Sequence, residues 1–341
     1  MDIKIINESQ KNLWDKYVET HPKSIAWQAY DWSKVLKKHY SVQFFPIAAF
    51  SKSKICGILP LYAIKTFLKP VKFISVPHAV AGGILADTDE ITSELLKYTI
   101  DFVKAKGGHC ITFKQYKYKI ENPLRTDENY YNRELSLSSE INSIYDGFAL
   151  QNKFYLDYSQ KYDIELVHPD SDSESFFKLV SIYNKNMGIP CDGKSWIKDL
   201  IDFGMYSTAL LVYDDRIVAG TMVKKFKNTV SFPFTCIPNE SETSLMFAYR
   251  LYWELIKKFA AEGFKIFHSG RIPITNKAAP FRLGWGGEKY TYYYQYYPAS
   301  TKITEYSQKH NPKRVFFQTV WKHLPVTVTS TLGPVIKQYF P

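Results

Sequence analysis

The sequence has few of the features that mark a secreted, membrane-spanning or disulfide-bonded protein. Only four cysteines occur in 341 residues, scattered at positions 56, 110, 191 and 236. This spacing excludes a small disulfide-stapled fold, and such thiols are typical of a reducing compartment. The N-terminal segment MDIKIINESQKNLWDKY lacks the apolar core of a secretory signal, and no run of about 18 apolar residues is present. We therefore expect a cytoplasmic protein.

Metal-binding and nucleophile motifs are also missing. None of the eight histidines lies three to five residues from another. Because the ligands of a zinc site usually include pairs that are close in sequence, we expect no metal site. We also expect no tightly bound cofactor. The sequence contains neither a G-x-S-x-G turn nor a G-x-x-x-x-G-K-[ST] loop. We interpret the four cysteines as buried apolar residues and expect no covalent intermediate.

What the sequence has in abundance is aromatic and basic residues. Aromatic side chains make up 16% of the chain and hydrophobic ones 45%, which excludes general disorder. Lys and Arg exceed Asp and Glu by 44 to 33, a net charge of +11. This charge favours an anionic partner such as tRNA, a nucleotide- or lipid-linked sugar precursor, or the inner face of a membrane, which the protein would contact peripherally. No motif points to DNA.

One pattern of predicted elements occurs twice along the chain. The first half reads as helices 10–20 and 29–39, a hairpin 44–64, a strand 71–76, a helix 89–106 and a strand 109–116. The second half reads as helices 173–187 and 194–203, a hairpin 208–226, a strand 230–236, a helix 242–261 and a strand 264–270. Gly57 and Gly220 align after the two hairpin turns. Such a repeat indicates a duplicated fold.

The repeat predicts an α/β (α+β) protein built from two tandem copies of one unit, each a mostly antiparallel sheet with packed helices. We expect an N-terminal domain at 1–150, a second domain at 151–305 and a helical tail at 306–341. The polar, turn-rich segment 117–150 would join the two copies, and the tyrosine run 290–297 would form a packed strand.

Five segments carry a family resemblance. They are Ala26-Trp27-Gln28 near the start, SVPHAVAGGIL at 75–85, SIYNKNMGIP at 181–190, FKIFHSGRIPITNKAAPFRLGWGG at 264–287, and the tail VWKHLPVTVTSTLGPVIKQYFP at 320–341. In this order they resemble the FemAB-like acyltransferases of the acetyltransferase-6 type, which carry two GNAT-fold domains in one chain. The tail resembles that of a subgroup associated with exopolysaccharide and protein-sorting loci.

The resemblance implies an acyltransferase that passes an aminoacyl or acyl group directly to an amine or hydroxyl of a cell-envelope or exopolysaccharide precursor. Gly270-Arg271 and Phe281-Arg282 stand at the family's most diagnostic positions, with Arg282 in place of the family's Lys. We expect Arg271 and Arg282 to be the catalytic pair, because a guanidinium binds phosphate or an oxyanion through two parallel bonds. The expected substrate-binding residues are Lys277, Phe281, Trp285, His78, Gly82, Gly83 and Trp27.

Each of these residues also has a structural interpretation. Exposed cations often form a solvated surface, and Phe281 and Trp285 suit a core. The donor is left open between aminoacyl-tRNA and acyl-CoA, and the alternative function is an acyl-CoA-dependent N-acetyltransferase that acts on a sugar amine. CIPNESETSL at 236–245 lacks the glycines that a pyrophosphate needs at a helix start, which disfavours acyl-CoA. A catalytically silent precursor-binding protein is a third hypothesis. The tail would either rest on a membrane or cap the second domain.

Overall fold

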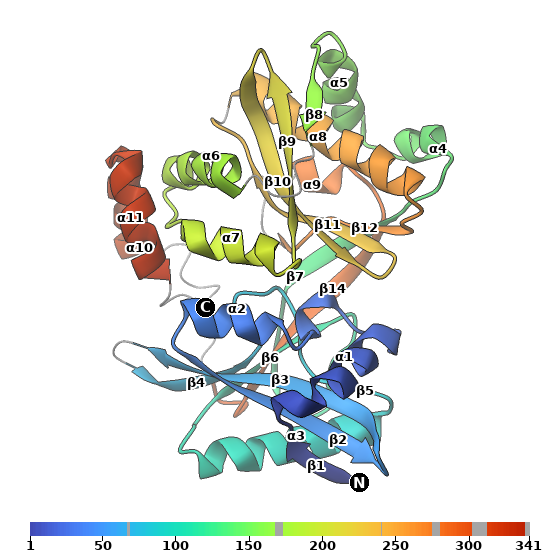
Figure 1. Ribbon diagram of the computed structural model, residues 1–341, viewed down its shortest axis with the longest axis vertical. Coiled ribbons are helices and arrows are strands. Elements are labelled where there is room, and N and C mark those ends of the chain that lie inside the picture. The colour runs from blue at the N-terminus through green and yellow to red at the C-terminus, as the bar shows by residue number, and fades with distance from the viewer. Residues whose placement is uncertain (67–68, 168–172, 240, 275–279, 302–311, 338–341) are drawn as a thin grey trace. The chain divides into compact units, whose positions relative to one another are not determined.

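The computed structural model describes residues 1–341 except 67–68, 168–172, 240, 275–279, 302–311 and 338–341 (Figure 1). The chain divides into two compact units. Unit 1 comprises Met1–Tyr131 and Tyr290–Tyr306, and unit 2 comprises Asn132–Lys289 and Ser307–Phe340. Within the described residues, no helix is long and apolar enough to cross a membrane.

Unit 1 is a mostly antiparallel sheet covered by helices on both faces. Its strand order is β1 (Asp2–Ile5), β2 (Val42–Ser51), β3 (Lys54–Thr66), β4 (Lys69–Ser75), β6 (Ile111–Tyr116) and β14 (Glu288–Tyr297), with β5 (Leu85–Ala86) on β3. Only the β4–β6 pair is parallel among the pairs that the described residues form in this unit. Its helices are η1 (Glu8–Gln10), α1 (Lys11–Thr20), η2 (Ala26–Gln28), α2 (Trp32–His39) and α3 (Asp89–Ala105).

The local sequence of helix α3 explains where the helix begins and which of its faces is buried. The Thr88 hydroxyl caps its start by accepting from the Ile91 amide, and acidic residues in the first turn suit the positive end of the helix dipole. Leu95, Leu96 and Val103 recur at helical spacing and are buried. The apolar stripe therefore packs on the sheet and fixes the helix.

Unit 2 repeats the plan. Its strand order is β7 (Arg125–Ser136, which enters unit 2 at Asn132), β12 (Ile266–His268), β11 (Thr229–Cys236), β10 (Arg216–Phe226), β9 (Ser207–Tyr213) and β8 (Glu165–Val167), with β13 (Ile272–Pro273) on β7. Its helices are α4 (Ile141–Asp146), α5 (Leu150–Ser159), α6 (Ser173–Met187), α7 (Lys194–Asp202), α8 (Glu242–Ala261), α9 (Pro280–Leu283), α10 (Pro312–His323) and α11 (Val326–Lys337). The expected duplicated α/β fold and the helical nature of the tail are confirmed.

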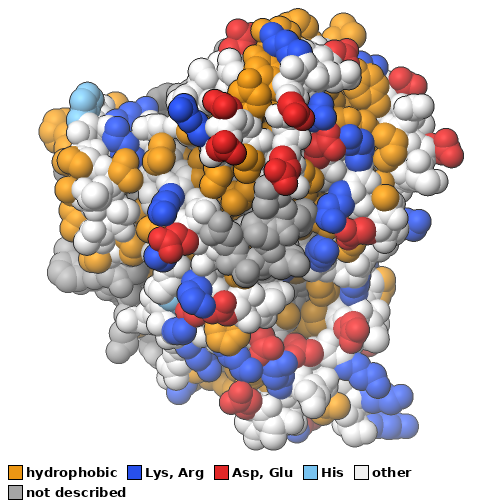
Figure 2. All heavy atoms as spheres, turned by 45° about the horizontal axis from the view of Figure 1, so that its top comes forward, with side chains coloured by type: hydrophobic (Ala, Val, Ile, Leu, Met, Phe, Trp, Pro, Cys, Tyr) orange, Lys and Arg blue, Asp and Glu red, His pale blue; other side chains and the backbone are white. Residues whose placement is uncertain are grey.

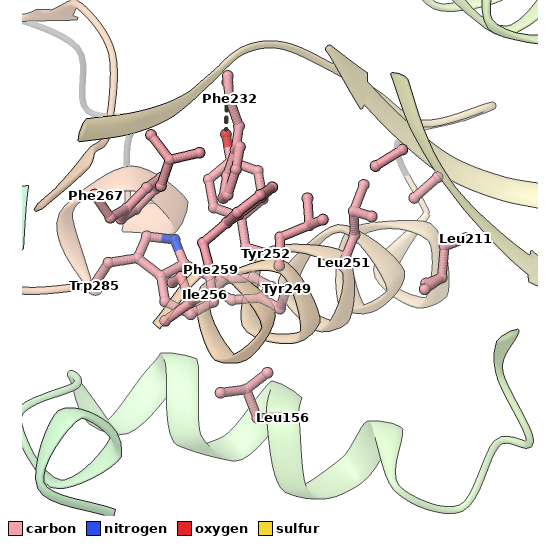
Figure 3. Packing of buried hydrophobic residues seen from close by; sticks show 14 of the residues in the cluster. Leu156, Leu211, Phe232, Tyr249, Leu251, Tyr252, Ile256, Phe259, Phe267 and Trp285 are labelled. Atoms are coloured by element: carbon pink, nitrogen blue, oxygen red, sulfur yellow. Dashed lines mark hydrogen bonds between the residues drawn. The ribbon is translucent and has the colours of Figure 1, made fainter. Parts of the chain in front are cut away.

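Helix α8 forms the centre of the unit 2 core (Figure 3). Tyr249, Tyr252 and Phe259 on α8 are fully buried. The Tyr252 ring packs edge-on against Phe232 of β11, with 5.1 Å between ring centroids, and its hydroxyl donates to the Phe232 carbonyl at 3.2 Å. This aromatic packing holds α8 on one face of the sheet, while α6 and α7 cover the other.

The contact-defined units differ from the contiguous domains expected at 1–150, 151–305 and 306–341. Tyr290–Tyr297 belongs with unit 1, because β14 pairs antiparallel with β6 over Tyr292–Tyr297. Helices α10 and α11 belong with unit 2, because both pack on α6. The joining segment 117–150 is also more structured than expected, since it contains the 12-residue strand β7. Buried polar residues such as Asn132 hide that strand in the sequence.

Both hairpins carry a β-bulge at the same place. On β3 the register shift against β2 leaves Cys56 as the extra residue. On β10 the shift against β9 leaves Val218 as the extra residue. In each case the bulge lies shortly after a tight turn, so the duplication extends to a detail of backbone geometry.

Counting from the bulge shows that Gly57 and Gly220 are not equivalent. Gly57 follows its bulge residue directly, whereas in unit 2 that place is taken by Ala219. A Cβ on Gly57 would lie 2.8 Å from Leu95 of α3, but a Cβ on Gly220 would lie 2.8 Å from Leu179 of α6. The alignment made from the sequence was therefore wrong by one residue, because a one-residue shift moves a strand position to the other face.

Candidate functional site

A cavity of about 150 Å³ lies in unit 2. Its walls come from α6, α7, β10 and β11, with single residues from α9 and α11, and about half of its lining residues are apolar. The polar side chains that reach it are Tyr183, Asn184, Asp192, Thr235, Cys236, Arg282 and Lys337. An apolar pocket with a few convergent polar groups is typical of a small-molecule site.

Arg282 reaches the cavity from the short helix α9. Its Nη1 donates to the Arg271 carbonyl at 3.1 Å. Gly270 has φ +84°, and a Cβ there would lie 3.2 Å from Nη1. The structure therefore brings the two predicted arginines together, and Arg271 contributes its backbone to the position of Arg282. A residue with a side chain at 270 would crowd the guanidinium.

Phe281 and Trp285 anchor α9 in the core. Trp285 is 1% exposed and lies against Tyr252, with 5.6 Å between ring centroids (Figure 3). The Phe281 ring packs edge-on against Tyr249 at 4.8 Å and Tyr252 at 4.7 Å. Their placement is that of core residues, and they fix the helix that carries Arg282.

A chain of hydroxyl groups runs from the cavity wall into the core. The Thr235 and Thr221 oxygens are 3.0 Å apart, and Thr235 lies 2.9 Å from the Tyr252 hydroxyl. Because the Tyr252 hydroxyl donates to the Phe232 carbonyl, its oxygen is left to accept from Thr235. Burial raises the Tyr252 pKa, although the nearby Arg282 charge opposes that rise. The phenol therefore stays neutral and keeps the Thr235 hydroxyl oriented.

The remaining charged and thiol groups of the cavity are constrained. Lys337 and Asp192 form an ion pair, with 2.5 Å between Nζ and Oδ2. Burial raises the pKa of the Cys236 thiol well above its usual range. Since the thiolate is the reactive form, Cys236 is unsuited to act as a nucleophile. In the described part of the chain, no group of three or more His, Cys, Asp or Glu side chains is arranged to hold a metal ion.

The other predicted residues lie in unit 1, apart from Lys277, which falls outside the described residues. The Gly82 and Gly83 amides both donate to the Lys114 carbonyl, at 2.9 and 2.8 Å. A Cβ on Gly82, whose φ is +146°, would lie 2.4 Å from Val76. The Gly-Gly loop is therefore closed by its own backbone bonds, which use the N–H groups that a pyrophosphate would need.

His78 and Trp27 also have structural surroundings in unit 1. The His78 ring stacks on Tyr40, with 3.9 Å between centroids and 12° between planes. Trp27, in η2, is 8% exposed. The structure thus brings Arg271, Arg282, Phe281 and Trp285 together in unit 2 and places His78, Gly82, Gly83 and Trp27 in unit 1.

Sequence reasoning missed Lys224 of β10. Its side chain is buried, with 9% exposed, and its ammonium lies 4.8 Å from the centre of the Tyr206 ring. Burial lowers the Lys224 pKa from 10.5 to about 8, and no acidic partner among the described residues offsets that effect. The sequence does contain a sign of this burial, because residues two apart on a strand share a face and Lys224 follows Gly220 and Met222 on one face of β10. In the structure Met222, on that face, lines the cavity.

Two tandem GNAT units, with the candidate site in the second, define the class of fold. Among solved structures, the chain is similar to FemX, with a TM-score of 0.65 at 12% identity, covering 86% of this chain and 97% of FemX. It is similar to L-PGS from Bacillus licheniformis, at TM-score 0.55 and 11% identity, covering 94% and 99% of the two chains. A tandem GNAT protein from the clavulanic acid biosynthesis pathway aligns at TM-score 0.53 and 11% identity, over 89% and 99%.

The sequence itself matches no protein-family model and no curated protein. At these identities the similarity to solved structures establishes the fold. The FemAB-like tandem GNAT fold expected from the sequence is thereby confirmed.

Proposed function

We propose that the protein is an acyltransferase and that the unit 2 cavity is its transfer site. The observation that carries the proposal is the Arg282 guanidinium, which the Arg271 carbonyl and the space beside Gly270 fix at the wall of the cavity. A fixed cation stabilises the negative charge that develops during acyl transfer. The fold shared with FemX and L-PGS supports this class of reaction.

In the proposed reaction, an amine or hydroxyl of an envelope precursor attacks the carbonyl carbon of an acyl ester. The carbonyl oxygen becomes an oxyanion, which Arg282 stabilises. The ester C–O bond then breaks, and the leaving oxygen ends with the proton that the attacking group loses. In this proposal the Asp192 carboxylate, which lines the cavity, takes the proton from the attacking group and returns it to the leaving oxygen. The Thr235 oxygen, whose hydrogen is directed at Tyr252, can accept a hydrogen bond from the attacking group.

The helix starts favour an aminoacyl ester over acyl-CoA as the donor. At α8 the Ser241 side chain caps the Ser244 amide and Glu242 occupies the first turn. At α3 the Thr88 cap is followed by Asp89 and Glu90. Carboxylates at a helix start repel a pyrophosphate, and capping groups take up the amides that would bind it.

The experiment compares Arg282→Lys and Arg282→Met with the wild type, using charged tRNA and acyl-CoA as alternative donors and a mass shift of the precursor as the readout. We expect Arg282→Met to lower turnover by about 10²- to 10³-fold, the usual loss on removal of an oxyanion donor, and Arg282→Lys to retain part of the activity. Full activity in Arg282→Met would overturn the site assignment. Saturable binding of acetyl-CoA, measured by calorimetry, would overturn the assignment of an aminoacyl ester as the donor. Binding of a precursor without turnover of either donor would overturn the proposal that the protein is an enzyme.

A further inference from the structure

The C-terminal helix pair α10–α11 leaves an apolar outer face uncovered by the described residues. Phe316 is 71% exposed and Val335 56%. Neighbouring apolar side chains on the two helices are exposed as well, namely Val315, Val320, Val328 and Leu332. Figure 2 shows hydrophobic side chains on the surface of this helix pair, at the left of the view. An exposed apolar cluster of this kind is typical of an interaction surface.

The inner face of the pair is docked by specific contacts. Trp321 and Thr329 are buried. A Cβ on Gly188, at the end of α6, would lie 2.8 Å from the Gln318 carbonyl of α10, and a Cβ on Gly333 of α11 would lie 2.8 Å from the Cys191 amide. The helices therefore pack closely on unit 2. The exposed residues form an outer face of a fixed element.

The charge of this region has one sign. From residue 306 to the C-terminus at 341 the sequence contains five Lys and Arg residues and no Asp or Glu. Unit 2 has a second exposed apolar stripe, Leu150, Phe154 and Tyr158 on α5, but there Asp157 lies on the same helix. Elsewhere on the face in Figure 2, acidic and basic side chains are interspersed. Within unit 2, Lys337 is paired with Asp192, whereas Lys322 at the end of α10 has an exposed side chain. Exposed apolar side chains on a basic segment that contains no acidic residue match the interface of an anionic membrane.

We propose that the outer face of α10–α11 docks on a membrane that contains anionic lipid. Phe316, Val320, Val328 and Leu332 would enter the boundary between head groups and acyl chains, and Lys322 would meet the head groups. Lys337 at the end of α11 also lines the unit 2 cavity. A docked protein would thus hold its cavity next to the lipid surface, and, on the proposed transfer function, its acceptor is lipid-linked.

The test is sedimentation of the purified full chain with vesicles of phosphatidylglycerol and phosphatidylcholine, or of phosphatidylcholine alone, at low and at high salt. We expect binding to the anionic vesicles that weakens with salt. Phe316→Glu should weaken it about tenfold, by removing apolar insertion and adding repulsion. Lys322→Gln should weaken it about fivefold, since one basic residue near such a surface is worth about 1 kcal/mol.

Phe154→Glu is the matched control, because it makes the same change at an exposed aromatic residue of the same unit. Unchanged binding in Phe154→Glu, with a loss in Phe316→Glu, supports the proposal. Equal binding to both vesicle types, no binding to either, or a loss in Phe154→Glu alone would overturn it, as would a concentration-dependent dimer that Phe316→Glu dissociates. A urea unfolding curve checks that each variant folds. The vesicle assay contains no acyl donor and measures no transfer, so a negative result would overturn membrane docking without bearing on the Arg282 test of the proposed function.

Discussion

The two units share one fold but have chemically different buried side chains at one pair of equivalent positions. Six residues beyond the bulge, unit 1 has Tyr62 on β3 and unit 2 has Lys224 on β10. Tyr62 is 1% exposed and stacks on Phe44, with 4.7 Å between ring centroids. Lys224 is also buried, at 9% exposed, but carries an ammonium group. Since an aromatic residue satisfies this position in unit 1, the fold by itself does not require the lysine.

The predicted glycine loops of the two units lie at different places in the repeat and also differ in what they do. In unit 1 the Gly82 and Gly83 amides both donate to the Lys114 carbonyl, so neither is available to bind a ligand. In unit 2 Gly270 makes room for a guanidinium beside a cavity. The glycine loop of unit 1 therefore serves packing, whereas Gly270 of unit 2 helps to position a charge.

The largest expected effect comes from a glycine pair, Gly82→Ala and Gly270→Ala. Gly82→Ala should lower the free energy of unfolding by about 4 kcal/mol, because its Cβ meets Val76 at 2.4 Å and its φ is +146°. Gly270→Ala meets only the end of the flexible Arg282 side chain, so we expect a loss of about 1 kcal/mol in stability but a fall in turnover. Urea unfolding and the transfer assay together measure both. A Gly270→Ala enzyme with normal turnover would contradict the comparison.

Lys224→Met should stabilise the protein at pH 7 by about 3 kcal/mol. The folded-state pKa of about 8 lies below the unfolded value of 10.5, so the unfolded chain binds more protons between these values. The wild-type free energy of unfolding should therefore rise as the pH increases from about 8 to about 10.5, and the variant should lose that rise. The control is Lys225→Met at the exposed neighbour, which should change stability little. A destabilised Lys224→Met would show that the ammonium has a partner that holds it.

The smallest expected effect tests the register of the hairpins. Gly57→Ala and Gly220→Ala should each destabilise by about 2 kcal/mol, because each new Cβ lies 2.8 Å from a leucine. Only Gly220→Ala presses on α6, whose Phe176 lines the cavity, so only it should also lower turnover. If both variants, or neither, change turnover, the assignment of Gly220 to the cavity face fails.

Much of the fold was predictable from local patterns. The apolar spacing of α3 and α8, the Thr88 cap and the hairpin alternation are properties of short segments, and the structure has the expected elements in the expected order. The site was predictable in part. Phe281-Arg282 drew attention to α9, but the roles of Thr235, Asp192 and Lys337 depend on elements far apart in sequence. Their own segments give no sign that they meet.

By itself, then, the sequence determined the elements, their duplication and the basic, acid-free tail, because periodicity and composition are local properties. Only the tertiary structure decided that β14 pairs with β6, that Gly220 faces α6 and that Lys224 is buried. It also decided that the Gly82 and Gly83 amides are already bonded. Each of these depends on which distant residues come into contact, and a strand shifted by one residue shows the same local pattern on the opposite face.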